Sequence, residues 1–361
     1  MYILKLKYLY ITISFLALAS SGIAQQADSL LTLEEIYSSQ EFRSDVQRSI
    51  SWIEEGDAFV SIEKDEAGND KLVRYESKNN KSSTYLAAEK LAVNGQHLAI
   101  EDFSLSPDAS KVLIFTNSSR VWRSNTKGDF WVYDFDTDSL KQLGKDFQAS
   151  SLMFAKFSKD NSYVAYVQDF NIYKENFKTG EITQLTEDGN GDIINGTFDW
   201  VYEEEFGMRD GFMWSPDASK IAFWQLDASE IETFYMINNT DSVYSEPIPL
   251  QYPKAGFDPS SAKVGIVDTK TSAIKWIPLP GDPVQHYLPA MQWINKDLLL
   301  IQQMNRKQNQ LSVFTYQPST SSLNEIYTET EKTWVDLRYP DISSNQWGNN
   351  DQLLVDNGRA F

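Results

Sequence analysis

Two kinds of hydrophobic periodicity divide the chain near residue 49. In residues 29–48 the apolar residues recur at helical spacing, and Thr32 followed by Glu35 matches a capping box, which marks the start of a helix. The apolar residues on one face of this predicted helix are Leu30, Leu33, Ile36 and Tyr37. From residue 49 onward, apolar and polar residues alternate with a period of two, which is typical of half-buried strands. The pattern therefore predicts a short helical segment followed by a region of β-strands.

The first 24 residues have the pattern of a secretory signal peptide. Lys5 and Lys7 precede an apolar run over residues 8–19, and the small residues Gly22 and Ala24 suit a cleavage site. A single membrane anchor is the alternative, but the run is shorter than the about 20 apolar residues that a spanning helix needs. We therefore expect export to the periplasm or the extracellular space, without a stable membrane anchor.

A phrase made of an apolar residue, a polar turn and a β-rich run recurs in the strand region. Three copies cover residues 105–115, 157–166 and 214–224, and their first serines are 52 and 57 residues apart. Two of the turns read Ser-Pro-Asp-Ala-Ser-Lys, in which Pro presets φ and Asp bonds backbone amides. Strand–turn–strand segments follow at 129–143 and 171–185. Four short strands in about 50 residues are the signature of a β-propeller blade, whereas a β-sandwich array would need units nearer about 100 residues.

These units predict an all-β fold, an incomplete β-propeller of about six blades over residues 49–361 with the last blade cut short. A propeller closes by placing its last blade against its first, and a partial arc would expose a sheet edge and an apolar blade face. We therefore expect the sequence to be the front part of a longer protein, with residues 25–48 as its N-terminal helical segment.

Composition and charge exclude several classes of function. The 361 residues include 32 Lys+Arg and 51 Asp+Glu, a formal net charge of −19, which disfavours binding to nucleic acid or to anionic membranes. The chain has no Cys and only two His, which excludes thiolate sites, Cys nucleophiles and metal sites with several His ligands. We expect no metal and no cofactor.

The sequence contains no complete set of catalytic residues. It lacks the Gly-x-Ser-x-Gly nucleophile elbow, the His-Glu-x-x-His motif and the Gly-rich loops that bind phosphates. Residues 188–193 resemble a Ca²⁺ loop only superficially, because the ligand spacing and the closing Glu are missing, and we interpret them as a turn. His97 follows a predicted turn at the start of a strand, and His286 lies in a predicted inter-strand loop; we assign neither a catalytic role.

One acidic segment is unusual for a surface turn. Three consecutive carboxylates, Glu203, Glu204 and Glu205, lie between the aromatic residues Tyr202 and Phe206. A solvated acidic turn is the simpler interpretation, but flanking aromatic side chains would hold this backbone against apolar structure. Adjacent carboxylates repel one another and need a positive partner. On a helix their side chains diverge by about 100°, so that two of them can approach one cation from either side, and an ammonium group with three N–H donors suits such a site.

Five segments resemble, in the same order along the chain, motifs of the dipeptidyl peptidase IV family of the prolyl oligopeptidase clan of serine peptidases. The most specific is Asp-Trp-Val-Tyr-Glu-Glu-Glu-Phe at 199–206, which resembles the double-glutamate motif of that family. The others are Val-Trp-Arg-Ser at 121–124, Phe-Met-Trp-Ser-Pro-Asp at 212–217, Tyr-Pro-Lys-Ala-Gly at 252–256 and Thr-Trp-Val at 333–335. The similarity covers essentially the whole chain after the signal peptide.

The resemblance implies an eight-bladed propeller followed by an α/β-hydrolase domain with a Ser-Asp-His triad. In that family the N-terminal helix packs on the hydrolase. This sequence ends inside the propeller, so the nucleophile, the oxyanion hole and the pocket beside the cleaved bond are not in it. We expect the α/β-hydrolase domain to follow Phe361, and the chain alone to be inactive.

The resemblance also implies roles for individual residues. Glu204 and Glu205 correspond to the pair that binds the free N-terminal ammonium of a peptide, and Glu203 would support them. Arg123 corresponds to the arginine that lies near the substrate carbonyl and close to the two glutamates, and Tyr202 would be part of the framework. A separation of more than about 10 Å between these carboxylates and the Arg123 guanidinium would count against a shared site.

The implied function is that of an exported serine-type dipeptidyl peptidase, which releases N-terminal dipeptides and is represented here by its substrate-gating propeller. Its partners would be peptides with free N-termini, and members of the family often form homodimers. Two alternatives remain open: a non-catalytic peptide- or protein-binding propeller that lacks the hydrolase domain, and an unrelated propeller that binds glycans or a protein. The last alternative predicts that Arg123 lies far from Glu204 and Glu205.

Overall fold

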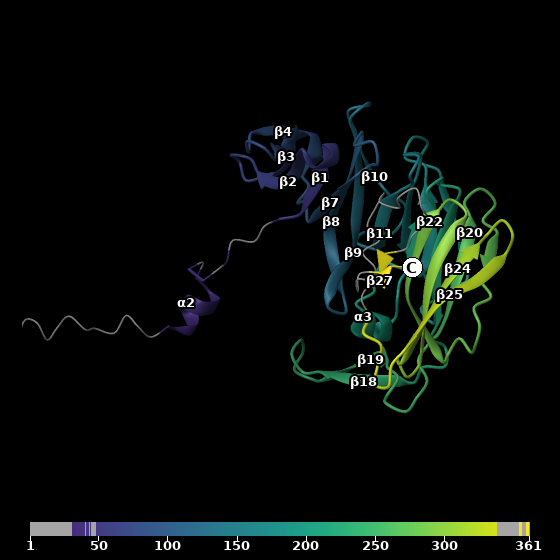
Figure 1. Cartoon of the computed structure of the whole chain (residues 1–361). Helices are drawn as coiled ribbons and strands as arrows, with labels where there is room; N and C mark the ends of the chain where they lie inside the picture. The colour runs from purple at the N-terminus through teal and green to yellow at the C-terminus, as the bar shows by residue number, and fades with distance from the viewer. Residues whose placement is uncertain are drawn as a thin grey trace, which may run out of the picture. The chain divides into compact units, whose positions relative to one another are not determined.

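The computed structural model describes residues 31–39, 41–42, 44 and 48–337, together with the backbone of two short strands near the C-terminus (Figure 1). The chain divides into two units, Met1–Arg48 and Ser49–Phe361, and each is described by itself. The predicted signal peptide over residues 1–24 lies outside the described residues. In the part of the chain that is described, no helix has the length and apolar character needed to span a bilayer.

The described part of the first unit contains one short helix, α2 (Leu33–Tyr37). The Thr32 side chain accepts a hydrogen bond from the backbone N–H of Glu35 (3.1 Å), and Glu35 accepts one from the backbone N–H of Thr32 (2.8 Å). These reciprocal bonds satisfy two free N–H groups at the helix start, and they confirm the predicted capping box. No residue of α2 is buried.

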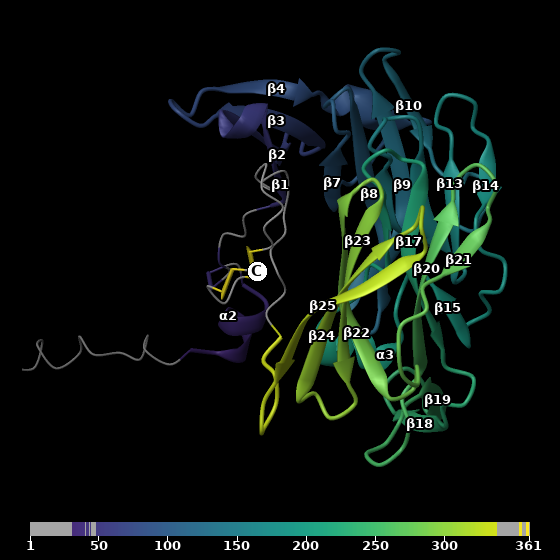
Figure 2. The ribbon, with the colours of Figure 1, turned by 45° about the vertical axis from the view of Figure 1, so that its right-hand side comes forward.

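The described residues of the second unit form five antiparallel blades, whose strands can be followed in Figure 2. Blade 1 consists of β1 (Ile50–Ile53), β2 (Ala58–Lys64), β3 (Asp70–Glu76) and β4 (Ser82–Leu86). Blade 2 consists of β7 (Asp102–Leu105), β8 (Lys111–Val121), β9 (Ser124–Asp134) and β10 (Ser139–Gln142). Blade 3 consists of β11 (Leu152–Phe157), β12 (Val164–Gln168), β13 (Asn171–Glu175) and β14 (Ile182–Gln184).

Blade 4 begins with two short strands, β15 (Ile193–Asn195) and β16 (Phe212–Trp214), which both pair with β17 (Lys220–Asp227). It continues with β20 (Ser261–Asp268) and β21 (Ile274–Trp276). Blade 5 consists of β22 (His286–Asn295), β23 (Leu298–Asn305), β24 (Gln310–Gln317) and β25 (Ser322–Thr330). The single longer helix in the described part of this unit is α3 (Trp200–Phe206), between β15 and β16.

Short elements connect the blades. The 3₁₀ turn η1 (Glu54–Gly56) joins β1 to β2 inside blade 1. The 3₁₀ turn η2 (Ala88–Leu91) follows this blade, and β5 (Ala92–Val93) then pairs with β6 (Gln96–His97). A two-stranded arm, β18 (Thr233–Asn238) and β19 (Glu246–Gln251), lies between β17 and β20 and was not predicted from the sequence. Much of the predicted sixth blade lies outside the described residues, where only β26 (Leu354–Val355) and β27 (Arg359–Ala360) are described, as a pair.

The alternation of side chains along central strands packs each blade against the next, and it joins blades 2, 3 and 4 to neighbours on both faces. On β12, Val164 and Tyr166 pack into a cluster shared with blade 2, whereas Ala165 and Val167 pack into one shared with blade 4. Successive strand residues point to opposite faces, so a strand buried on both faces is apolar throughout. Equivalent clusters join blades 1 and 2 and blades 4 and 5. The structure resembles a propeller arc, and the predicted all-β fold is confirmed.

The repeated Ser-x-Asp turns all use the same hydrogen bonds. The Ser106 hydroxyl donates to the Asp108 carboxylate (2.7 Å) and accepts a bond from the backbone N–H of Lys111 (3.0 Å). The same pair of bonds recurs in the other two copies, at Ser158–Asp160–Tyr163 and Ser215–Asp217–Lys220. The tight turns predicted from the repeated phrase are therefore confirmed.

Candidate functional site

Helix α3 is an excursion from the first strand of blade 4. β15 pairs with the C-terminal half of β17 and β16 with its N-terminal half, so the two short strands follow one track and the helix leaves the sheet between them. At the base of the excursion, Gly211 N–H donates to Gly196 carbonyl oxygen (2.9 Å). A Cβ on Gly211 would lie 2.6 Å from the Gly196 carbonyl carbon, so only glycine permits this approach of the two backbones.

Both ends of α3 are capped. The Asp199 carboxylate accepts bonds from the backbone N–H of Tyr202 (3.0 Å) and from the Ser260 hydroxyl (2.6 Å), which ties the helix start to the segment before β20. Burial raises the pKa of Asp199, and these bonds oppose that effect. Gly207 ends the helix in the left-handed conformation, with φ of 64°. The helix therefore has a fixed start, end and direction.

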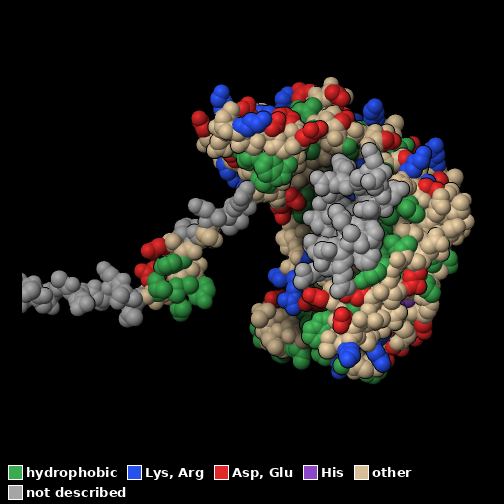
Figure 3. Space-filling model, in the orientation of Figure 1, with side chains coloured by type: hydrophobic (Ala, Val, Ile, Leu, Met, Phe, Trp, Pro, Cys, Tyr) green, Lys and Arg blue, Asp and Glu red, His purple; other side chains and the backbone are tan. Residues whose placement is uncertain are grey.

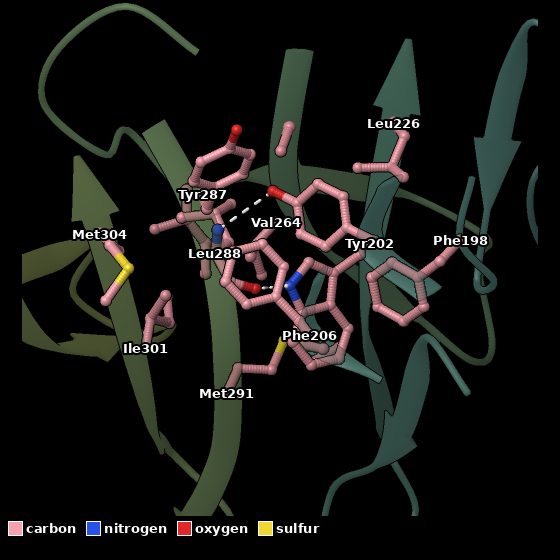
Figure 4. Close-up of a cluster of buried hydrophobic side chains, with 14 of the residues drawn as sticks. Phe198, Tyr202, Phe206, Leu226, Val264, Tyr287, Leu288, Met291, Ile301 and Met304 are labelled. Atoms are coloured by element: carbon pink, nitrogen blue, oxygen red, sulfur yellow. Dashed lines mark hydrogen bonds between the residues drawn. The ribbon is translucent and has the colours of Figure 1, made fainter. Parts of the chain in front are cut away.

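One face of α3 is buried in the cluster between blades 4 and 5. Tyr202 is fully buried, its ring lies 5.4 Å from that of Phe198, and its hydroxyl accepts a bond from the backbone N–H of Leu288 (3.1 Å; Figure 4). Burial raises the pKa of Tyr202, which keeps the phenol neutral. Trp200 packs on Tyr252, next to the β18–β19 arm, with ring centroids 4.5 Å apart. Both aromatic side chains thus belong to the framework that holds the helix.

The three glutamates of α3 have different environments. The Glu203 side chain is 5% exposed, and its carboxylate accepts a bond from Arg209 Nε (3.0 Å). The Glu204 side chain is 20% exposed, and its carboxylate accepts a bond from Arg123 Nε (2.5 Å). Glu205 is exposed, and within the described residues no hydrogen bond or ion pair joins its carboxylate. The helix therefore presents two paired carboxylates and one that is open to solvent.

Arg123 reaches α3 from blade 2 because β8 and β9 extend beyond the rest of that blade. Their register runs to Val121 opposite Ser124, so Trp122 and Arg123 form a two-residue hairpin turn. The extension also lets β9 pair with β11, which joins blades 2 and 3 into one eight-stranded sheet. Trp122 has φ of 50°, because the first position of a two-residue hairpin loop requires a positive φ.

The structure thus brings Arg123 and Glu204 into contact although 81 residues separate them in the sequence. The Arg123 side chain is 72% exposed, and exposed ion pairs contribute little to stability, about 0–1 kcal/mol. A contribution to the stability of the fold therefore does not explain why Arg123 and Glu204 are paired. Because Glu204 adds both a hydrogen bond and a negative charge, the pKa of Arg123 is raised above its already high ordinary value.

The contact of Arg209 with Glu203 was missed at the level of the sequence. Arg209 was visible only as a residue between Gly207 and Gly211, and nothing in its spacing from Glu203 indicated a bond. The contact depends on the reversal of the chain at Gly207, whose αL conformation brings the following residues back toward the last helical turn.

Residues 188–193, which resemble a Ca²⁺ loop, have structural partners. The Asp188 carboxylate accepts bonds from the side chains of Asn195 and Gln225 (both 2.9 Å), and the Asn190 side chain accepts bonds from the backbone N–H groups of Asp192 and Ile193. Across the described residues, no group of three or more His, Asp or Glu side chains is arranged to hold a metal ion.

Comparison with known proteins gives one consistent family. The family described as "Dipeptidyl peptidase IV (DPP IV) N-terminal region" matches residues 106–355. Dipeptidyl aminopeptidase B of Saccharomyces cerevisiae is 30% identical over 256 residues, which are 69% of this chain and 31% of the yeast protein. A Schizosaccharomyces pombe protein named as a dipeptidyl aminopeptidase is 28% identical over 302 residues, 79% of this chain and 37% of that protein.

The crystal structure of Porphyromonas gingivalis dipeptidyl peptidase 4 has a TM-score of 0.78 with this chain at 27% sequence identity. It covers 86% of this chain, and the match extends over 44% of the crystallised chain. The sequence thus spans about a third of the length of the curated relatives described above. Since the matched family region includes well over half of the chain, the protein belongs to the dipeptidyl peptidase IV family, of which it comprises the N-terminal region.

Proposed function

We propose that this chain is the substrate-gating propeller of an exported serine-type dipeptidyl peptidase, and that it binds the free N-terminus of peptide substrates. The observation that carries the proposal is the Arg123–Glu204 contact beside the solvent-exposed Glu205 on a helix fixed at both ends. Membership of the family supports the same function.

The carboxylates suit a primary ammonium group. Such a group has three N–H donors, and Glu204 and Glu205 offer acceptor oxygens on adjacent positions of one helix. Arg123 uses Nε for Glu204, so its remaining guanidinium N–H groups are available for a carbonyl oxygen of the bound peptide. Charge-assisted bonds at both places would hold the first residue of the peptide in one orientation.

Binding of the amine would determine which peptide bond is cleaved. Two extended residues span at most about 7 Å, so a fixed N-terminus places the second peptide bond at a defined distance from Glu204 and Glu205. An acetylated N-terminus has no charge and one N–H donor, and it would leave the Glu205 carboxylate without a cation. Where the bound peptide excludes water from this charge, leaving it unpaired costs about 2–5 kcal/mol, which would exclude blocked peptides.

The remaining parts of this function are proposed from the family and the sequence. The Ser-Asp-His triad would belong to an α/β-hydrolase domain C-terminal to Phe361, and a second copy of the protein is a further proposed partner. Export would depend on the segment over residues 1–24, which has the features of a signal peptide.

The proposal is tested with the full-length gene product on a Gly-Pro chromogenic amide, free and N-acetylated. We expect cleavage of the free amine only, and a loss of about 100-fold or more in kcat/KM for the Glu204→Ala/Glu205→Ala variant, since each removed contact is a charge-assisted bond. Glu230→Ala/Glu232→Ala is the matched control, because it removes two carboxylates from exposed positions beside the β18–β19 arm.

Two results would contradict the proposal. Equal cleavage of the acetylated amide would show that the protein does not recognise the free amine. Full activity of the folded Glu204→Ala/Glu205→Ala variant would show that these two residues do not bind the substrate. If the gene encodes no hydrolase domain, binding of free but not acetylated peptide would favour the non-catalytic peptide-binding propeller instead.

A further inference from the structure

Arg209 lies in the short segment that returns from α3 to β16. Its Nε donates to the Glu203 carboxylate (3.0 Å) and its Nη1 to the Gly207 carbonyl oxygen (3.3 Å). The neighbouring Asp210 forms an ion pair with Lys156 of blade 3, whose ammonium group also donates to the Phe212 carbonyl oxygen (2.8 Å). The return segment is therefore tied to the helix at one end and to blade 3 at the other.

Glu203 depends on this arginine. Its side chain is 5% exposed, and a buried carboxylate that loses its positive partner is strongly unfavourable. Within the described part of the chain, Arg209 is the one residue that forms an ion pair with Glu203. The Arg209 side chain is itself 34% exposed, and its bonds to Glu203 and to the Gly207 carbonyl oxygen fix the direction of its guanidinium.

The charges of the triplet are divided unequally. Arg209 neutralises Glu203 and Arg123 neutralises Glu204, which leaves the exposed Glu205 as a single negative charge. One negative charge matches one ammonium group. We propose that Arg209 is a positioning and specificity-determining residue, which holds Glu203 away from Arg123 so that Arg123 pairs with Glu204 and the site accepts a single positive charge. The part that concerns the ligand rests on the proposed function.

The alternative partner for Arg123 is close at hand. Glu203 precedes Glu204 on the helix, and its charge already contributes to raising the pKa of Arg123. Arg123 lies on an exposed hairpin turn with 72% of its side chain accessible, so it is free to change partner. Removal of the Arg209 charge therefore makes Glu203 compete with Glu204 for Arg123, and it adds a negative charge to the site.

The first test needs no ligand. Crystal structures of the whole chain are compared for the wild type, Arg209→Gln and Arg209→Lys. We expect Arg123 to contact Glu203 in Arg209→Gln and Glu204 in Arg209→Lys, which keeps the charge. The Glu203→Gln/Arg209→Gln variant has a neutral pair at this place and should keep the Arg123–Glu204 contact, also if Arg209→Gln alone does not fold. An unchanged Arg123–Glu204 contact in Arg209→Gln, or its loss in the neutral-pair variant, would overturn the proposal.

The second test measures dissociation constants by calorimetry for two peptides, Gly-Pro-Ala-Ala and Lys-Pro-Ala-Ala, both with free N-termini. In the wild type we expect affinities within about threefold of each other, because a second positive charge finds no carboxylate left to pair with. Arg209→Gln should bind the Gly peptide at least about tenfold more weakly than the wild type does. The ratio of the two dissociation constants should shift about fivefold or more in favour of the Lys peptide. Arg209→Lys and the neutral-pair variant should restore the wild-type ratio.

The two tests separate the failure of this inference from that of the proposed function. If the wild type binds neither peptide, the proposed function is contradicted, and the crystal structures still decide whether Arg209 selects the partner of Arg123. If the wild type binds the peptides and Arg209→Gln keeps both the affinities and their ratio, Arg209 has no positioning role and the proposed function stands.

Discussion

His286 is held as a neutral imidazole at the start of blade 5. It is 6% exposed; Nε2 lies 3.0 Å from the Ala262 carbonyl oxygen, and Nδ1 lies 2.7 Å from Gln303 Nε2. The Gln303 amide nitrogen can only donate, so Nδ1 accepts and Nε2–H donates to Ala262. Burial lowers the pKa of His286 below its ordinary value of 6.5, against the opposing effects of the Ala262 carbonyl and the Asp282 charge.

The lowered pKa predicts a loss of stability in mild acid. Between pH 6.5 and the lowered pKa, the unfolded chain binds a proton that the folded chain does not, so the free energy of unfolding falls as the pH falls and levels off below the folded pKa. Urea unfolding from pH 8 to pH 5 measures this slope. His286→Gln should flatten it, because the variant has no group here whose protonation differs between the folded and the unfolded chain. A His286→Gln profile parallel to that of the wild type would contradict the prediction.

Individual site residues differ in how far the sequence predicts them. Arg123 and Glu204 could be proposed as neighbours because each stands in a specific motif, and the structure places them in contact. The sequence assigned Glu203 only a supporting role and gave no partner for it. Its partner, Arg209, is selected by the turn at Gly207 and by the burial of α3, and neither is encoded in the spacing of charged residues.

Among the structural elements, the Ser-x-Asp turns contain a residue that is poorly suited to its conformation. Ala109 has φ of 56° in the first copy and Ala218 has φ of 58° in the third, whereas the second copy has Asn161 at φ of 57°. The left-handed region costs a residue with a Cβ about 1 kcal/mol, and glycine or asparagine adopts it more readily.

Ala109→Gly should therefore stabilise the protein, by about 0.5–1 kcal/mol in the free energy of unfolding, since the strain relieved exceeds the added entropy of the unfolded chain. Urea unfolding of the whole chain measures the change. The control is Ala67→Gly, in an exposed turn where the alanine has no positive φ, and it should be neutral or destabilising. A destabilised Ala109→Gly would show that the Ala109 methyl group contributes more through packing than the strain costs.

The elements themselves were predictable where their cause is local. The repeated turns and the alternating runs define strands without reference to the rest of the chain, and both are found. The excursion of α3 from a strand track and the extension of β8 and β9 were not predicted. Both depend on which backbone groups pair across the sheets, such as Val121 with Ser124 and Gly211 with Gly196, and sequence periodicity does not contain that information.

For the second unit as a whole, the repeat predicted the right architecture because each blade needs a neighbour on both faces. A central strand such as β12 is apolar at successive positions, which makes sense only when two clusters flank it. The β18–β19 arm does not pack between two blades, and its side chains Tyr235 and Ile237 are 62% and 67% exposed. The repeat therefore gave no reason to expect it.

Salt should affect the stability of this protein, which has a net charge of −19, and its binding of peptides in opposite directions. Acidic and basic side chains are both present on the face shown in Figure 3, but the excess is negative, so the folded chain repels itself at neutral pH. Screening shortens the Debye length from about 30 Å at 0.01 M to about 10 Å at 0.1 M salt. We expect Tm at pH 7.5 to rise by about 2–5 °C between 10 and 200 mM NaCl.

Binding of a free-amine peptide should respond to the same salt in the other direction, with an affinity at least about threefold lower at 200 mM, because exposed charges such as Arg123 and Glu205 are screened. Calorimetry measures the affinity and differential scanning fluorimetry measures Tm. The control is the same salt series at pH 4.5, near the sequence pI, where the repulsion vanishes and with it the rise in Tm. An equal rise in Tm at both pH values would mean that salt acts on hydrophobic burial and not on the excess charge. A rise in Tm confined to pH 7.5, together with weaker peptide binding, requires two separate electrostatic origins. One is the negative charge spread over the molecule, and the other is the charged site at α3.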